Sequence, residues 1–321
     1  MVAAVAPRPV MHVMAAVMHD AEGRVLLAQR PAGKHLAGMW EFPGGKLERD
    51  EAPLAGLARE LREELGVDLQ RAEPLIRVPC RYVDRELLLD TWHTDQWRGV
   101  PQSLEGQALQ WLAPAQIDPS ILTPADRAIL QAWRLPHRYS ITPPEVRPEQ
   151  CGAWFEHIGQ AIKRGERLIQ LRLPLWPREQ VRVLAAALLP LARRHGAGLL
   201  LHGDIEGALG LGIGVQLKSA QLATLSARPL PLSQPVGASC HEAAHLAQAQ
   251  AIAADFATLS PIAATRDLPQ RLPLGWQRFH SWAESAALPV YALGGTAPSH
   301  IAQARQCSGQ GVAGMREFWL L

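Results

Sequence analysis

Three glutamates, Glu60, Glu63 and Glu64, crowd together in the stretch GKLERDEAPLAGLARELREELGV, which spans residues 45–67. At helical spacing they stand at i, i+3 and i+4, so their side chains share one face. Carboxylates in one patch repel unless a cation lies between them. Hard oxygen ligands of this kind favour Mg²⁺, which keeps water ligands and reaches substrate phosphates. The pattern predicts a metal site for phosphate chemistry, with a solvated charged helix as the alternative.

The same stretch predicts the helix that carries these glutamates. Pro53 suits the first turn of a helix, and Gly66 suits its termination. Arg59 is expected off the acidic face, where it pairs with Glu51 and fixes the preceding loop to the helix. Apolar residues at helical spacing form the predicted buried stripe, and they are Leu54, Leu57, Ala58, Leu61 and Leu65.

The spacing of the whole stretch decides between the two interpretations. Gly45, five residues, Glu51, seven residues and then the run RELREELGV over 59–67 match the box of the Nudix hydrolases at every specified position. The first half of the chain therefore resembles that family. The resemblance implies an α/β/α sandwich that cleaves nucleoside diphosphates linked to another group. It implies Mg²⁺ as the cofactor, with Mn²⁺ as an alternative.

The resemblance also implies roles for single residues. The implied catalytic residues are Glu60, Glu63, Glu64 and Arg59. The implied metal ligands are the Gly44 carbonyl and the side chains of Glu60, Glu63, Glu64 and Glu105, the last in the later acidic loop EGQALQW. The implied structural positions of the box are Gly45, Glu51 and Gly66.

The flanking residues resemble the MutT branch of the family, which hydrolyses 8-oxo-dGTP to 8-oxo-dGMP and pyrophosphate. The run LAQRPAGKHLAGMWEFPGGKLE, residues 27–48 around Arg30 and Phe42, carries this resemblance. The substrate-binding residues that it implies are Arg30, His35, Phe42, Tyr82, Arg85 and Asp126. Each has a plainer interpretation: a surface strand end for Arg30, loop support for His35, core packing for Phe42 and a hairpin tip for Arg85. Glu105 could equally be a solvated loop residue.

Asp126 departs from the branch's pattern, which has an Asn at the base-reading position. An Asn side chain offers a donor and an acceptor, whereas an ionised Asp only accepts. Asp126 could accept from the N–H groups of guanine or from the N7–H of the oxidised base. It could not donate to O6 unless protonated. Asp126 is also a candidate first-turn acid of the helix that TPADRAILQAWRL predicts.

In the second half, short apolar runs alternate with Ala- and Leu-rich helical segments, which predicts parallel strands closed into a (β/α)8 TIM barrel. The predicted domains are residues 1–136 and 137–321. Residues 139–321 resemble the thiamine-phosphate synthase/TenI group through YSIT, LIQLR, GVQL and LPVYALGG. We expect no synthase activity, because Pro174, His202–Gly203 and Gln221 stand where the synthases have their lysine and metal-binding acids. Backbone N–H groups at Gly294, Gly295 and Thr296 form a candidate site for a small phosphorylated ligand.

Composition narrows the function classes. The chain has 321 residues, 48% of them hydrophobic, and a net charge of +2, which argues against a surface for duplex nucleic acid. Four dispersed cysteines without a CxxC pair indicate a reducing compartment, so we expect a cytoplasmic protein without membrane partners. The expected activity is Mg²⁺-dependent hydrolysis of oxidised purine nucleoside triphosphates. The alternative is hydrolysis of thiamine-pathway diphosphates or toxic analogues, with the barrel as a ligand-binding regulatory module.

Overall fold

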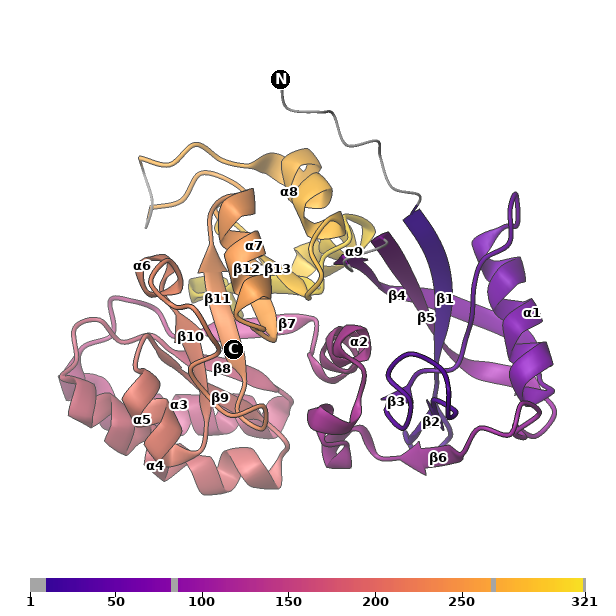
Figure 1. Ribbon diagram of the computed structural model, residues 1–321. Coiled ribbons are helices and arrows are strands. Elements are labelled where there is room, and N and C mark those ends of the chain that lie inside the picture. The colour runs from indigo at the N-terminus through magenta and orange to yellow at the C-terminus, as the bar shows by residue number, and fades with distance from the viewer. Residues whose placement is uncertain (1–9, 82–85, 267–269, 320–321) are drawn as a thin grey trace. The chain divides into compact units, whose positions relative to one another are not determined.

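The computed structural model describes residues 10–81, 86–266 and 270–319. The chain forms two compact units, which divide between Arg134 and Leu135 (Figure 1). Each unit has its own hydrophobic core. None of the helices in the described ranges is both long and apolar enough to cross a membrane.

The N-terminal unit contains two three-stranded sheets with a helix on either side of the larger one (Figure 1). The larger sheet has the order β1-β5-β4, in which β1 runs parallel and β4 antiparallel to β5. The smaller, antiparallel sheet has the order β3-β2-β6. The strands are β1 (Val10–Met18), β2 (Val25–Gln29), β3 (Trp40–Glu41), β4 (Asp68–Arg81), β5 (Glu86–Arg98) and β6 (Leu109–Leu112). The helices are α1 (Pro53–Leu65) and α2 (Pro124–Arg134), with 3₁₀ turns η1 (Pro114–Gln116) and η2 (Pro119–Ile121). The predicted α/β/α sandwich is confirmed.

Helix α1 forms where its end signals predict. Pro53 occupies the first turn, and Gly66 takes the left-handed conformation at φ 68° that lets its N–H cap the Arg62 carbonyl. Leu57, Leu61 and Leu65 are fully buried against β1 and Val67. Leu54, predicted in the same stripe, is 41% exposed. That prediction was wrong because helical periodicity identifies a face but not how far the core extends along it.

The C-terminal unit is a closed barrel of eight parallel strands, as the alternating pattern predicts. The strands are β7 (Arg138–Ile141), β8 (Leu168–Leu171), β9 (Gly198–His202), β10 (Gly214–Leu217), β11 (Val236–Cys240), β12 (Phe256–Leu259), β13 (Val290–Leu293) and β14 (Gly311–Gly314). The helices are α3 (Cys151–Arg164), α4 (Arg178–Arg194), α5 (Ile205–Leu211), α6 (Ser219–Leu222), α7 (Ala243–Ala251), α8 (Gly275–Glu284) and α9 (Ile301–Gln306). Three 3₁₀ turns complete the unit, η3 (Pro148–Gln150), η4 (Pro298–His300) and η5 (Arg316–Phe318).

The barrel interior is filled by side chains. Tyr139, Phe256 and Tyr291 pack edge to face or tilted, with ring centroids 5.4 to 5.6 Å apart. The Tyr139 hydroxyl lies 3.2 Å from Gln170 Oε1 and 3.0 Å from Gln216 Oε1, so its polar end is satisfied inside the core. The barrel is therefore a packed core rather than a channel.

The packing of α1 gives a stability prediction. Leu57→Ala removes a fully buried side chain and should lower the free energy of unfolding of the N-terminal unit by about 2–5 kcal/mol. Leu54→Ala on the exposed turn should change it by about 0.5 kcal/mol or less. Urea unfolding of the full chain, followed by hydrogen exchange in peptides from residues 10–134, measures both. Equal losses would contradict the burial pattern.

Candidate active site

The loop before α1 lies so close to β1 and α1 that two glycines are required. The Met14 N–H donates to the Gly45 carbonyl at 2.7 Å, and the Ala16 N–H donates to the Pro43 carbonyl at 2.8 Å. A Cβ on Gly44 would lie 2.1 Å from the Met14 carbonyl oxygen. A Cβ on Gly45 would lie 2.0 Å from Glu60 Oε2. The glycine pair thus brings loop backbone directly against a carboxylate of the box.

Arg59 is the centre of an ion-pair network. Its Nε and Nη2 donate to the two oxygens of Glu51, both at 3.0 Å, and Nη2 also donates to the Lys46 carbonyl. Its Nη1 lies 2.9 Å from Glu60 Oε1 and 3.1 Å from Glu63 Oε2. One guanidinium therefore neutralises part of the charge on three carboxylates, and these carboxylates hold its pKa above the ordinary arginine value.

This network corrects one expectation about Arg59. The pairing with Glu51 forms, but Arg59 does not lie off the acidic face, because it also contacts Glu60 and Glu63. The long arginine side chain reaches across the turn, which helical spacing alone does not reveal. Within residues 10–81, 86–266 and 270–319, no three acidic, imidazole or thiol side chains are placed to hold a metal ion together.

Glu64 is the box carboxylate outside the Arg59 network. It is partly buried, and its Oε2 accepts the Gly44 N–H at 3.2 Å. Burial raises the pKa of Glu64 to about 7; the Gly44 hydrogen bond lowers it, and the charges of Glu105, Glu60 and Glu41 raise it further. Among the described residues, no cationic side chain pairs with Glu64.

The donor set at this place fits a divalent cation. A partly buried carboxylate without a cationic partner in the described ranges, that of Glu64, lies beside a loop that only glycines permit, and the surrounding donors are hard oxygens. Of the expected ligands, Glu60 and Glu64 lie against this loop; metal binding by them together with Glu63, the Gly44 carbonyl and Glu105 stays a prediction.

The loop that carries Glu105 is tied to the end of α1. The Leu104 N–H donates to the Glu64 carbonyl at 3.1 Å, and Gln107 Nε2 donates to the same carbonyl at 3.3 Å. Gln107 is buried, and its Oε1 accepts the Glu105 N–H. The Glu105 carboxylate is about half exposed and lies 3.5 Å from Lys34 Nζ. Sequence reasoning missed Gln107 and Lys34, although both lie in the quoted runs.

Arg30 is held by its own loop. Its Nε donates to the His35 carbonyl at 2.6 Å, and its Nη1 donates to Glu41. Burial raises the pKa of Glu41, and the Arg30 charge lowers it. Glu41, another residue that sequence reasoning missed, is thus part of the acid cluster around Glu64. The His35 side chain is exposed, and its carbonyl supports the loop.

Asp126 joins the base of α2 to the loop before α1. It is buried, its Oδ1 accepts the Phe42 N–H at 2.9 Å, and its Oδ2 accepts the Thr123 hydroxyl at 2.5 Å. Burial raises the pKa of Asp126 to about 7 against these two hydrogen bonds, which lower it. Phe42 itself is 3% exposed and belongs to the buried residues of the unit. Tyr82 and Arg85, the other expected substrate contacts, lie outside the described residues.

At the mouth of the barrel, the two residues after β13 must be glycines because of their backbone conformation and close packing. Gly294 and Gly295 have φ values of 92° and 70°, and a Cβ on Gly295 would lie 2.7 Å from Ala263 Cβ. The Thr296 hydroxyl donates to the Ala313 carbonyl at 2.7 Å. Backbone conformation and close packing therefore account for these residues, and phosphate binding by Gly294, Gly295 and Thr296 stays a prediction.

His202 and Gln221, which stand where the resemblance implies an Asn and a metal-binding Asp in the synthases, hold internal hydrogen bonds here. His202 Nδ1 lies 2.7 Å from Gln170 Nε2, and burial, with the charges of Arg172 and Lys218, lowers the pKa of His202 to about 4. Gln221 Nε2 donates to the Gly203 carbonyl at 2.9 Å. These side chains supply no carboxylate for a metal-bound diphosphate.

Comparison with known proteins agrees with this architecture. A family model described as a NUDIX domain matches residues 13–132, and one described as thiamine monophosphate synthase matches residues 139–318. The chain belongs to both families, with a Nudix hydrolase of the MutT-like type in its N-terminal part and a thiamine monophosphate synthase domain in its C-terminal part. Nudix hydrolases in general depend on divalent metal ions.

Three relatives illustrate the two halves. The CTP pyrophosphohydrolase of Escherichia coli (strain K12) is 41% identical over 121 residues, which cover 38% of this chain and 89% of the relative. The 8-oxo-dGTP diphosphatase of Proteus vulgaris is 41% identical over 88 residues, 27% of this chain and 79% of the relative. The thiamine-phosphate synthase of Laribacter hongkongensis (strain HLHK9) is 31% identical over 172 residues, 52% of this chain and 81% of the relative.

The raised pKa of Asp126 gives a prediction about pH. Its pKa is about 7 in the folded state against 3.8 for an ordinary Asp, so the folded chain keeps a proton here that the unfolded chain loses. The contribution of protonated Asp126 to the free energy of unfolding is fully present below about pH 4. It is lost as the pH rises through about 7. Asp126→Asn keeps an acceptor for the Phe42 N–H and should abolish this fall, on the order of 1–4 kcal/mol.

The measurement is the free energy of unfolding of the N-terminal unit between pH 5 and pH 8. Asp118→Asn is the control, because a backbone hydrogen bond from Ser120 lowers the pKa of the exposed Asp118. The contribution of ionised Asp118 to the free energy of unfolding is lost only below pH 5. This variant should therefore show the same dependence of the free energy of unfolding on pH as wild type between pH 5 and 8. The same slope in Asp126→Asn as in wild type would contradict the account.

Proposed function

We propose that the N-terminal unit is a Mg²⁺-dependent pyrophosphohydrolase of purine nucleoside triphosphates that acts on 8-oxo-dGTP and yields 8-oxo-dGMP and pyrophosphate. The observation that carries the proposal is that Glu60 and Glu64 lie against the Gly44–Gly45 loop, while Arg59 joins Glu63 to Glu60. The relatives named 8-oxo-dGTP diphosphatase support the choice of substrate.

The residues of the site have distinct parts in this reaction. A bound divalent ion would polarise phosphoryl oxygens and lower the pKa of a water ligand. Glu64, which accepts the Gly44 N–H beside the expected metal ligands, is the proposed acceptor of a proton from water. Arg59 orients Glu60 and Glu63 from one side through its ion pairs. Arg30 and Lys34 are the cationic groups of the loop before β3, where triphosphate oxygens would find partners.

Asp126 is proposed to act as a positioning residue. Both of its oxygens accept hydrogen bonds from protein groups, Phe42 N–H and Thr123 O–H. It therefore fixes the backbone at Phe42, two residues before Gly44, and would read the base only if those bonds rearranged. On this view Asp126→Asn alters substrate selectivity by less than about tenfold, because an amide oxygen can replace the same acceptor.

Two other substrate classes have specific support. The relative named CTP pyrophosphohydrolase, 41% identical to this chain, favours cytidine triphosphate as a second candidate. The thiamine monophosphate synthase domain in the same chain favours diphosphates of thiamine precursors as a third. In that case the barrel, proposed to lack synthase activity, would bind a related ligand and regulate the hydrolase.

The test is kcat/KM of the full chain with Mg²⁺ for 8-oxo-dGTP, dGTP, CTP and a hydroxymethylpyrimidine diphosphate. The proposal predicts the highest value for 8-oxo-dGTP, with pyrophosphate as a product. Glu64→Gln should lower it by about 10²–10⁴-fold, the range for a lost general base. Glu22→Gln, at an exposed turn with Arg24 as its ion-pair partner, should leave it unchanged.

Each outcome assigns a substrate class. A higher value for CTP would replace the purine proposal with the cytidine one. A hundredfold preference for the pyrimidine diphosphate would move the enzyme to thiamine-precursor chemistry. No pyrophosphate from any triphosphate, with the Glu64 and Glu60 side chains intact, would refute the proposed function.

A further inference from the structure

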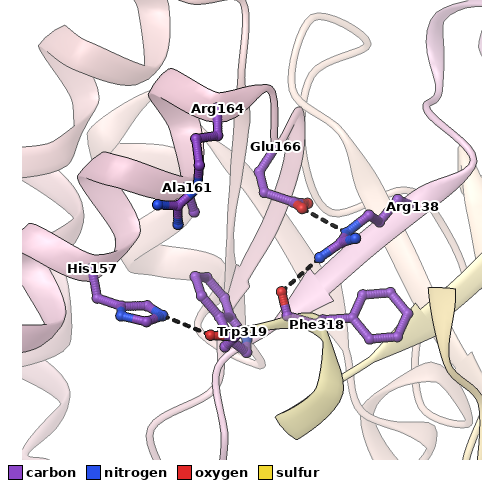
Figure 2. Close-up of a pocket in the computed structure, with 7 residues that line it drawn as sticks. All are labelled: Arg138, His157, Ala161, Arg164, Glu166, Phe318 and Trp319. Carbon is purple, nitrogen blue, oxygen red and sulfur yellow. Dashed lines mark hydrogen bonds and ion pairs between the residues drawn. The ribbon is translucent and has the colours of Figure 1, made fainter. Parts of the chain in front are cut away.

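A cavity of about 60 Å³ lies at the end of the barrel where the strands begin (Figure 2). Arg138 opens β7, Arg164 ends α3, and Glu166 precedes β8. Residues Phe318 and Trp319 of the C-terminal segment close the other side. Ligand sites of (β/α)8 barrels lie at the opposite end, after the strands. Its lining residues all belong to the barrel unit and differ from those of the barrel mouth.

The first guanidinium of the cavity is already neutralised. Arg138 Nε lies 2.5 Å from Glu166 Oε1, and Arg138 Nη2 donates to the Phe318 carbonyl at 2.7 Å (Figure 2). The Nε contact is an ion pair without hydrogen-bond alignment, so this buried N–H finds no well-aligned acceptor in the described ranges. The second oxygen of Glu166 accepts the Ser140 hydroxyl at 2.7 Å. Both oxygens of Glu166 therefore already have partners, Arg138 and Ser140.

The second guanidinium belongs to Arg164, an exposed residue at the rim of the cavity. Arg164 belongs to the cavity lining, and its guanidinium end turns toward the gap above His157 and Trp319 (Figure 2). Among the described residues, no carboxylate pairs with it. His157 Nε2 lies 3.1 Å from the Trp319 carbonyl oxygen, which can only accept, so this nitrogen carries a proton. The lining thus combines two guanidiniums, an imidazole and one neutralised carboxylate.

The size of the cavity limits the ligand. About 10–15 Å³ of such space holds one water, so the cavity admits a group of about four to six non-hydrogen atoms. Guanidinium groups bind phosphate oxygens through paired N–H donors. We propose that this cavity binds a phosphate-sized oxyanion, held chiefly by Arg164 with Arg138 as the second guanidinium. The ligand is either free phosphate or the phosphoryl end of a small monoester.

The test is binding of sodium phosphate to the full chain, measured by calorimetry and by the shift in unfolding temperature at constant ionic strength set with NaCl. Wild type should bind and be stabilised. Arg164→Gln should weaken binding at least tenfold, and Arg164→Lys should retain part of it. Lys163→Gln is the matched control, because it removes the same charge from the neighbouring position of the last turn of α3. Pyrophosphate release by the Nudix unit should be unchanged in all four proteins.

A parallel titration with glycerol 3-phosphate identifies the source of the oxyanion. Tighter binding than phosphate, with the same dependence on Arg164, assigns the site to a monoester; weaker binding assigns it to free phosphate. Phosphate binding that is equal in wild type and Arg164→Gln would overturn the proposal, as would its absence in wild type. An equal loss in Lys163→Gln would also overturn it, because the effect would then be one of overall charge.

Discussion

The N-terminal unit holds several carboxylates close together. Their mutual repulsion must be compensated, because it would otherwise destabilise helix α1. Arg59 provides part of the solution, since one guanidinium contacts Glu51, Glu60 and Glu63. The rest of the unit brings further acids to the same place. The glycine loop donates an N–H to Glu64, and Gln107 ties the Glu105 loop to the end of α1. Glu64 remains without a cation, and this is the group whose charge a metal ion would compensate.

The two units use buried polar groups in different ways. In the Nudix unit, Asp126 is buried and Glu64 is partly buried, and burial raises the pKa of each carboxyl group to about 7. In the barrel, His202 and Gln221 stand where the resemblance implies an Asn and a metal-binding Asp, and they are hydrogen-bonded to the Gln170 amide and the Gly203 carbonyl. The barrel fold is thus retained, and the loss of synthase activity stays a prediction.

The sequence predicts those features that depend on local patterns. The helix that begins at Pro53 and the eight barrel strands follow from local end signals and from alternating apolar runs. Contacts that depend on long-range placement could not be predicted in the same way. The bond from Phe42 N–H to Asp126 joins residues 84 positions apart, and no local pattern encodes it. The reach of Arg59 to Glu60 and Glu63 depends on a side-chain conformation, and the exposure of Leu54 depends on where the core ends.

The central claim is that Glu60, Glu63 and Glu64 bind a divalent cation. Arg59 forms ion pairs with two of these glutamates, Glu60 and Glu63. Electron paramagnetic resonance of Mn²⁺ titrated into the full chain, with Mg²⁺ as competitor, tests it without reference to any substrate. We expect one Mn²⁺ site that Mg²⁺ displaces and that Glu60→Gln or Glu64→Gln weakens by about 10- to 100-fold or more, because each removes a ligand charge. Glu22→Gln should bind as wild type does. Undiminished Mn²⁺ affinity in both box variants would contradict the account.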